Sequence, residues 1–161
     1  MRKKALFALI CCALLLWTGA MAEVPAFSEK LFKTAKQTLC ALAEGDYDSI
    51  VSNCPFSDLS PDVKEWKTFA KAFSNLEGSE PQTRYAVAYW NGKCWKIAVP
   101  IETPSSKDVE TLVLTSEDGK TFCGYACTSW GKVYKDYNNS EYVKWDSEYN
   151  ASEMAKVVSD D

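Results

Sequence analysis

Apolar residues in the first half of the chain recur every three or four positions, which is the period of a helix with one buried face. The stripe from Leu31 to Ala43 predicts a long helix with Ser28 as its N-cap and Gly45 at its end. Asp46 then offers a cap for a short second helix. The first half of the chain is therefore expected to begin with two successive helices.

A third helix is predicted to begin at Ser60-Pro61, because proline is tolerated in the first turn of a helix. Trp66, Phe69 and Phe73 then share one face at helical spacing. The chain that precedes the first strand-like run is therefore expected to be helical.

At Tyr85 the apolar period shortens to two residues, which is typical of half-buried strands. The next two runs flank Asn91-Gly92, a dipeptide that favours a two-residue hairpin loop. A loop of that length would place Ala88 opposite Trp95. The sequence therefore predicts a first antiparallel hairpin here.

A second hairpin is predicted around Asp118-Gly119, which would place Leu112 opposite Tyr125. Helices followed by hairpins indicate an α+β fold. The expected architecture is a set of N-terminal helices packed on a curved, mainly antiparallel sheet, with a C-terminal extension.

The C-terminal part has a weaker pattern. Residues 132–137 are compatible with a fifth strand or with an irregular turn. Residues 141–158 favour a helix that carries Tyr142, Trp145 and Tyr149 on one side. Residues 138–161 are therefore expected to be a peripheral helix or a tail.

The first 22 residues have the pattern of a secretory signal. Three basic residues precede a short apolar run from Ala5 to Trp17, and Ala20-Met21-Ala22 provides small residues for cleavage. That run is shorter than a membrane-spanning helix requires. We expect cleavage after Ala22, secretion without a membrane anchor, and one α+β domain over residues 23–161.

The predicted mature chain is acidic. The signal contains three basic and no acidic residues, so 15 basic and 22 acidic residues remain, for a net charge of −7. Nucleic-acid binding requires clustered basic residues, and binding to anionic lipid is also disfavoured by this charge. The expected partner is therefore a small molecule, a glycan or another protein.

The residue types of many catalytic sites are missing. The chain contains no histidine, which removes Ser-His and Cys-His nucleophile systems and the commonest metal ligand. The sequence predicts no metal site, no cofactor and no catalytic residue.

Five cysteines follow the signal, an odd number that leaves at least one thiol free or paired with another chain. An exported protein is permitted disulfides. A helix–turn–helix return could bring Cys40 near Cys54, so this pair is the disulfide candidate. Cys123 and Cys127 are too far apart along one strand to bond.

Aromatic residues carry the remaining functional signal. Alternation along the first hairpin places Tyr85, Val87 and Tyr89 on one face, with Cys94 opposite Tyr89, while Trp95 is expected to face the helices. The candidate ligand-binding surface consists of Tyr85, Val87, Tyr89 and Cys94. The competing interpretation is a sheet covered on both faces, with the C-terminal segment over this second face.

The segment LCALAEGDYDSI, from Leu39 to Ile50, resembles the first connection between helices in nuclear transport factor 2-like domains, which belong to the cystatin-like cone folds. In these domains a long helix ends in a Gly-Asp-Tyr type break before a short helix. The resemblance extends over roughly Phe27 to Thr128 and includes the two predicted hairpins. It implies a sheet that curls around a helix and leaves a pocket at its open end. Many secreted bacterial members look like non-catalytic binding domains, and no catalytic motif of the family matches this chain.

Three functions are compatible with these patterns. The favoured one is a secreted, non-catalytic domain that binds a small ligand or a partner protein. The first alternative is a pocket enzyme of isomerase or hydrolase type that uses a buried Asp or Tyr. The second is a glycan-binding module with Tyr142, Trp145 and Tyr149 as its stacking platform.

Overall fold

The computed structural model describes residues 23–58 and 60–146. The predicted signal with its cleavage site, and the C-terminal segment that contains Tyr149, lie outside these residues. The elements are α2 (Lys30–Glu44), α3 (Tyr47–Asn53), α4 (Val63–Ala70), β1 (Val87–Trp90), β2 (Trp95–Pro100), β3 (Glu110–Ser116), β4 (Gly124–Ser129), α5 (Trp130–Asn138) and β5 (Val143–Trp145).

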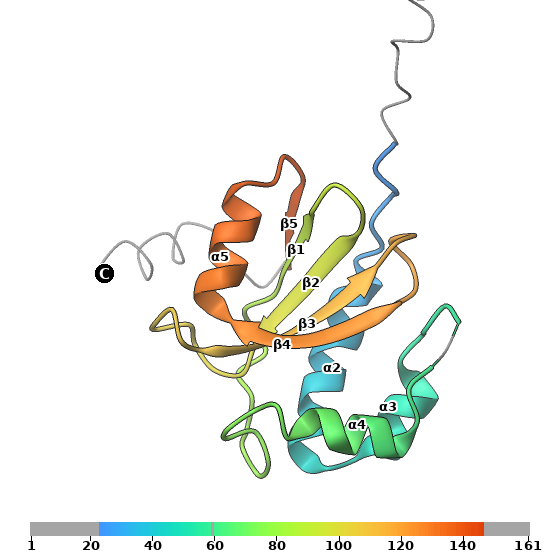
Figure 1. Cartoon of the computed structure of the whole chain (residues 1–161), viewed down its shortest axis with the longest axis vertical. Coiled ribbons are helices and arrows are strands. Elements are labelled where there is room, and N and C mark those ends of the chain that lie inside the picture. The colour runs from blue at the N-terminus through green and yellow to red at the C-terminus, as the bar shows by residue number, and fades with distance from the viewer. Residues whose placement is uncertain (1–22, 59, 147–161) are drawn as a thin grey trace, which may run out of the picture.

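The five strands form one open sheet in the order β4-β3-β2-β1-β5, and every neighbouring pair is antiparallel. Figure 1 shows the twisted sheet with α2, α3 and α4 packed together beside it. The predicted α+β class, with helices that precede a mainly antiparallel sheet, is confirmed.

The first three helices begin and end at identifiable residues. Gly45 ends α2 with a left-handed backbone (φ 73°), and the Asp46 side chain accepts a hydrogen bond at the start of α3. Two predicted caps are wrong. Glu29, not Ser28, occupies the N-cap of α2, and a capping box between Asp62 and Glu65 starts α4 two residues after Ser60.

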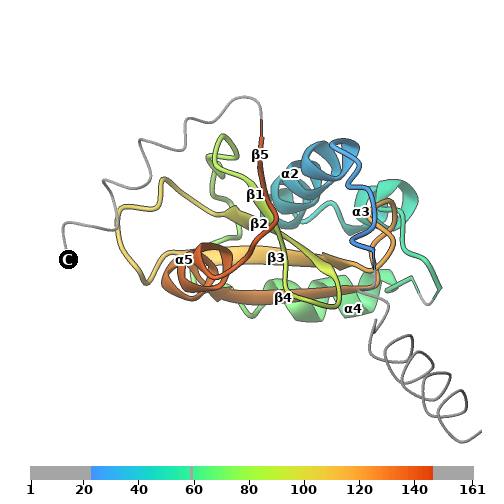
Figure 2. The ribbon, with the colours of Figure 1, turned by 90° about the horizontal axis from the view of Figure 1, so that it is seen from above.

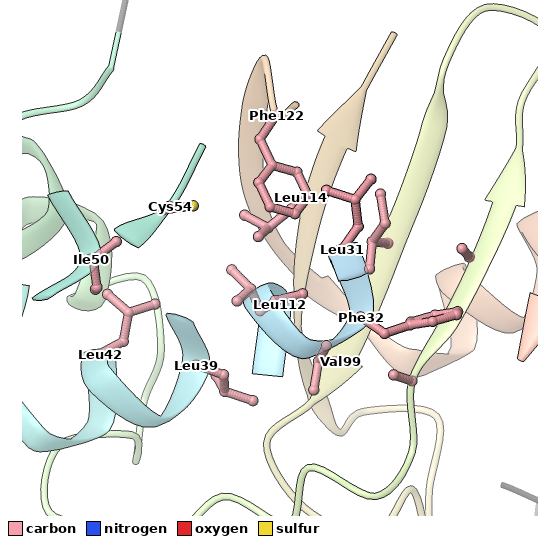
Figure 3. Packing of buried hydrophobic residues seen from close by; sticks show 14 of the residues in the cluster. Leu31, Phe32, Leu39, Leu42, Ile50, Cys54, Val99, Leu112, Leu114 and Phe122 are labelled. Carbon is pink, nitrogen blue, oxygen red and sulfur yellow. The ribbon is translucent and has the colours of Figure 1, made fainter. Parts of the chain in front are cut away.

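The main core lies between α2 and the sheet. Figure 3 shows side chains of α2 that meet Val99, Leu112 and Leu114 from β2 and β3. Trp95 and Ile97 belong to this core as well, which confirms that they face the helices.

A second core fills the opposite face of the sheet, beneath α5. It contains Tyr85, Val87, Tyr89, Ala98, Val109, Val113, Trp130, Val133 and Tyr137. Figure 2 shows α2 and α5 on opposite sides of the sheet. The expectation of a strand or irregular turn over residues 132–137 is therefore wrong, and the competing interpretation of a sheet covered on both faces is correct.

Both hairpins differ from the predicted register by two residues. Ala88 pairs with Ile97 instead of Trp95, and Leu112 pairs with Cys127 instead of Tyr125. Because the side-chain period of a strand is two, this shift leaves every residue on its predicted face.

Asn91 explains the longer first loop. Its Oδ1 accepts hydrogen bonds from the backbone N–H groups of Lys93 (3.0 Å) and Cys94 (2.9 Å). Residues 91–94 thus form a side-chain-closed turn, and pairing begins only at Trp90 and Trp95.

Asp118 organises the second loop in the same way. It accepts hydrogen bonds from the backbone of Lys120 and Thr121 and from the Ser116 hydroxyl. Partial burial acts to raise the pKa of Asp118, but these hydrogen bonds outweigh it and lower the pKa to about 2.

The segment after Asp136 contains another departure from the sequence prediction. A helix was expected over residues 141–158, but Val143–Trp145 forms edge strand β5, which pairs with β1. Backbone bonding to β1 fixes this segment as a strand.

The N-terminal segment is tied to the sheet before α2 begins. The Trp95 indole N–H donates to the Pro25 carbonyl at 2.8 Å, and the Ser28 N–H donates to the Gly119 carbonyl at 2.8 Å. The Phe27 ring lies 5.0 Å from that of Trp95. These contacts hold Glu23 and Val24 at the end of the sheet where the first hairpin turns.

Candidate functional site

A pocket of about 850 Å³ lies at the turn end of the first hairpin. Its walls come from the N-terminal segment, the β1–β2 loop, the end of α5 and the α5–β5 loop. The lining residues are Glu23, Val24, Tyr89, Trp90, Asn91, Gly92, Asp136, Asn139, Ser140, Glu141 and Tyr142.

Hydrogen bonds join the α5–β5 loop to the end of β1. The Ser140 hydroxyl donates to the Trp90 carbonyl at 2.7 Å, and the Trp90 N–H donates to the Tyr142 carbonyl at 3.0 Å. Because these bonds link the two walls, the pocket is largely preformed.

Tyr89 and Asp136 form the polar centre of the pocket. The Tyr89 side chain is buried, with 3% of its surface exposed, and its hydroxyl lies 3.5 Å from Asp136 Oδ2. Burial and the Asp136 carboxylate raise the pKa of Tyr89 far above its ordinary value, so the phenol stays protonated.

Asp136 reaches the pocket from the last turns of α5. Lys132, one helical turn earlier, forms an ion pair with Asp136 Oδ2 at 2.9 Å. Tyr89 and Lys132 both contact Asp136 through Oδ2, and among the described residues no hydrogen-bond partner meets its Oδ1. Asp136 therefore has an acceptor available in addition to its ion pair.

Only one of the four residues of the candidate ligand surface lines this pocket. Tyr89 does so, whereas Tyr85 and Val87 are buried in the second core beneath α5. Cys94 lies in the first loop, where its thiol is 3.4 Å from Asn91 Oδ1, and not opposite Tyr89. The aromatic face predicted as a binding surface is mostly an internal packing face.

The two described residues of the glycan platform, Tyr142 and Trp145, do not lie on a helix. Tyr142 is 49% exposed and lines the pocket. Trp145, in β5, is half-buried, with its ring centroid 5.2 Å from that of Tyr137. Tyr149 lies outside the described residues.

The disulfide candidate is not formed in the structure. Cys40 and Cys54 are free thiols, as are Cys94, Cys123 and Cys127. Cys54 instead lies 3.7 Å from the Thr38 hydroxyl. Among the residues that the structure describes, no group of three or more Cys, Asp or Glu side chains is placed to hold a metal ion.

Two smaller hollows lie along the outer side of α2, with volumes of about 570 and 540 Å³. Both include Lys36, which forms an ion pair with Asp146 at 2.9 Å. The pocket at Tyr89 is larger than either hollow, and its described lining contains aromatic rings and carboxylates without a lysine, so it is the candidate site.

The sequence prediction missed Asp136, because residues 132–137 were not recognised as helical. A local signal existed. Lys132 and Asp136 are four residues apart, a spacing that places opposite charges side by side on a helix.

Comparisons of the chain with known protein families, with curated proteins and with solved structures found no match. Over residues 23–58 and 60–146, no helix has the length and apolar character that a membrane crossing requires. The site is therefore interpreted from its own chemistry.

Proposed function

We propose that this protein is a secreted, non-catalytic binding domain that takes a small ligand in the pocket at Tyr89. The pocket supports this in two ways. Its volume lies in the range of small-molecule sites, and it combines aromatic rings with a few polar groups. The observation that carries the proposal is the approach of a buried Tyr89 hydroxyl to Asp136 inside this pocket.

The protonation state of Tyr89 favours binding over catalysis. A general base works best with a pKa near the working pH, whereas burial and Asp136 raise the pKa of Tyr89 well beyond that range. A protonated phenol is instead suited to donate a hydrogen bond to a ligand or to a neighbouring carboxylate.

Two further proposals accompany this function. Secretion is supported by the signal-like pattern of residues 1–22. A relation to nuclear transport factor 2-like domains is supported by three helices that precede an antiparallel meander. The segment after Ser129, with α5 and β5, departs from that plan.

A fragment screen by nuclear magnetic resonance tests the function, with the chain that begins at Glu23. Neutral, anionic and cationic fragments are all included. We expect bound fragments to shift the amide signals of Tyr89, Asn139 and Ser140. Tyr142→Ala should weaken their binding, because it removes an exposed ring from the pocket wall.

Val51→Ala is the matched control, since Val51 is also an exposed apolar residue but lies on α3 outside the pocket. It should leave fragment binding unchanged. Fragments that bind only elsewhere, or no binding by any fragment, would contradict the proposed function.

A further inference from the structure

We propose that the ligand of this pocket is a small organic cation, with an ammonium group held by the carboxylates and aromatic rings of the lining. The inference rests on the proposed function, because it names the ligand class of the same pocket. Charge, helix direction, ring chemistry and the Tyr89 hydroxyl each contribute to it.

Among the residues that the structure describes, the charged side chains of the lining are all acidic. Glu23, Asp136 and Glu141 line the pocket, and no lysine or arginine of residues 23–58 and 60–146 does so. Cleavage after Ala22 would add one α-ammonium group at Glu23, and the lining would still contain more carboxylates than ammonium groups. An anionic ligand would therefore be repelled, whereas a cation would be attracted.

The direction of α5 adds to this negative potential. The helix ends at Asn138, and Asp136, Asn139 and Ser140 at this end line the pocket. Backbone carbonyls give the C-terminal end of a helix a partial negative charge, which stabilises a nearby cation.

Aromatic residues from β1 and from the α5–β5 loop line the same pocket. Tyr89 and Tyr142 belong to this lining, as does Trp90, although the Trp90 ring packs beside that of Trp95 on the helix-facing side of the sheet. The negative ring faces of aromatic residues attract ammonium groups, and aromatic cages bind quaternary ammonium ligands. Tyr142 is 49% exposed, so its ring remains accessible to a ligand.

The Tyr89 hydroxyl is a buried polar group whose hydrogen bond to Asp136 is unusually long. Its side chain is 97% buried, but among the described residues its hydroxyl has one hydrogen-bond partner, Asp136 Oδ2, at 3.5 Å. Ordinary O–H···O hydrogen bonds are about 2.5–3.0 Å long. Tyr89 thus contributes a hydroxyl with one long hydrogen bond to the pocket. The neighbouring Oδ1 of Asp136 can accept a hydrogen bond from a ligand.

Lys132 does not take the place of the cationic ligand in the pocket. Its side chain is 64% exposed, it does not line the pocket, and it contacts Asp136 only through Oδ2. The ion pair therefore positions the carboxylate from the solvent side and leaves the pocket side open for a ligand.

The test compares two probes of nearly equal shape. Choline and 3,3-dimethylbutan-1-ol differ mainly in the charged nitrogen, which is a neutral carbon in the alcohol. Titration into the chain that begins at Glu23, followed by amide chemical shifts, gives both dissociation constants. We expect choline to bind at least about tenfold more tightly than the alcohol, because cation–π and carboxylate contacts require the charge.

Two isosteric variants locate the charge effect. Asp136→Asn keeps the shape of the side chain and should reduce choline binding severalfold without affecting the neutral alcohol. Asp48→Asn removes an exposed carboxylate on α3 and should change neither. Added salt should weaken choline binding to the unmodified chain and to Asp48→Asn by the same factor, and should weaken it less for Asp136→Asn.

The outcomes separate the two proposals. Equal binding of both probes, or no binding of choline while other fragments occupy the pocket, overturns the cation inference and leaves the binding function intact. No occupation of the pocket by any fragment or probe overturns both. A normal spectrum of Asp136→Asn verifies that a loss of binding does not reflect misfolding.

Discussion

Gly119 connects the second hairpin to the N-terminal segment at the scale of a single residue. Its backbone is left-handed (φ 71°), and its carbonyl accepts the Ser28 N–H. A Cβ atom at this position would clash with the backbone carbonyl of Ala26. Glycine is therefore required both by the local turn and by the close approach of a second chain segment.

We predict that Gly119→Ala destabilises the protein more than Gly92→Ala. Gly92 also has a positive φ (94°), but a Cβ atom there meets nothing within 4 Å. Gly92→Ala should cost about 1–2 kcal/mol from backbone strain alone, and Gly119→Ala about 2–4 kcal/mol, because the clash adds to the strain. Urea unfolding measures both. Equal losses would show that the Ala26 segment moves aside without cost.

At the scale of elements, α5 determines which residues on the second face of the sheet are buried and which line the pocket. Ser129 caps the helix by accepting the Lys132 N–H, and Trp130, Val133 and Tyr137 point into the second core. The helix covers Tyr85 and Val87, whereas Tyr89 near the end of β1 lines the pocket. Its last turn supplies Asp136 to the pocket, so packing and site formation depend on the same element.

Substitutions on the two sides of α5 should therefore change the free energy of unfolding by different amounts. Val133 is fully buried, and Val133→Ala should lower the free energy of unfolding by about 1–3 kcal/mol. Lys135→Ala, on the exposed side, should change it by less than about 0.5 kcal/mol. Chemical denaturation of both variants checks this. If Val133→Ala were as mild as the control, α5 would not belong to the cooperative fold.

The elements that the sequence predicted well are those with a repeated local signal. The stripe of α2, the Gly45 stop and the strand alternation from Tyr85 onward follow directly from side-chain period and caps. The strand registers are harder to predict from the sequence, because the loop lengths depend on hydrogen bonds of the Asn91 and Asp118 side chains. The tail was mispredicted because β5 is held by backbone pairing with β1, which no local pattern encodes.

The candidate site was predictable only in part for a related reason. Tyr89 was found by strand alternation, and Tyr142 by its aromatic character. Asp136 depends on a helix that the pattern left ambiguous, and Glu23 reaches the pocket through contacts with a distant strand. Pockets formed by four separate segments require the tertiary arrangement that joins them.

At the scale of the whole molecule, one sheet separates two cores, and the cysteines are distributed over both the interior and the surface. Cys54 and Cys94 are buried, Cys40 and Cys127 are half-buried, and Cys123 is exposed. Burial, supported by Glu110, raises the pKa of Cys127 to about 11, and burial raises that of Cys54 to about 11. Their thiolate fraction at neutral pH is therefore very small.

We predict that the chain that begins at Glu23 contains five free thiols when denatured and that, in its native state at pH 7, it is alkylated slowly, first at Cys123. A raised pKa means that the rate should increase about tenfold per pH unit as the thiolate fraction grows. Cys54 and Cys94 should react only when the fold opens, so their rates should follow the unfolding equilibrium. Iodoacetamide labelling with peptide mapping measures each site, and Cys123→Ser should remove only the fastest phase. Fewer than five thiols after denaturation would show that a disulfide exists, and the peptide map would show whether it joins Cys40 to Cys54. A buried thiol that reacts rapidly at pH 7 would restore the enzyme alternative.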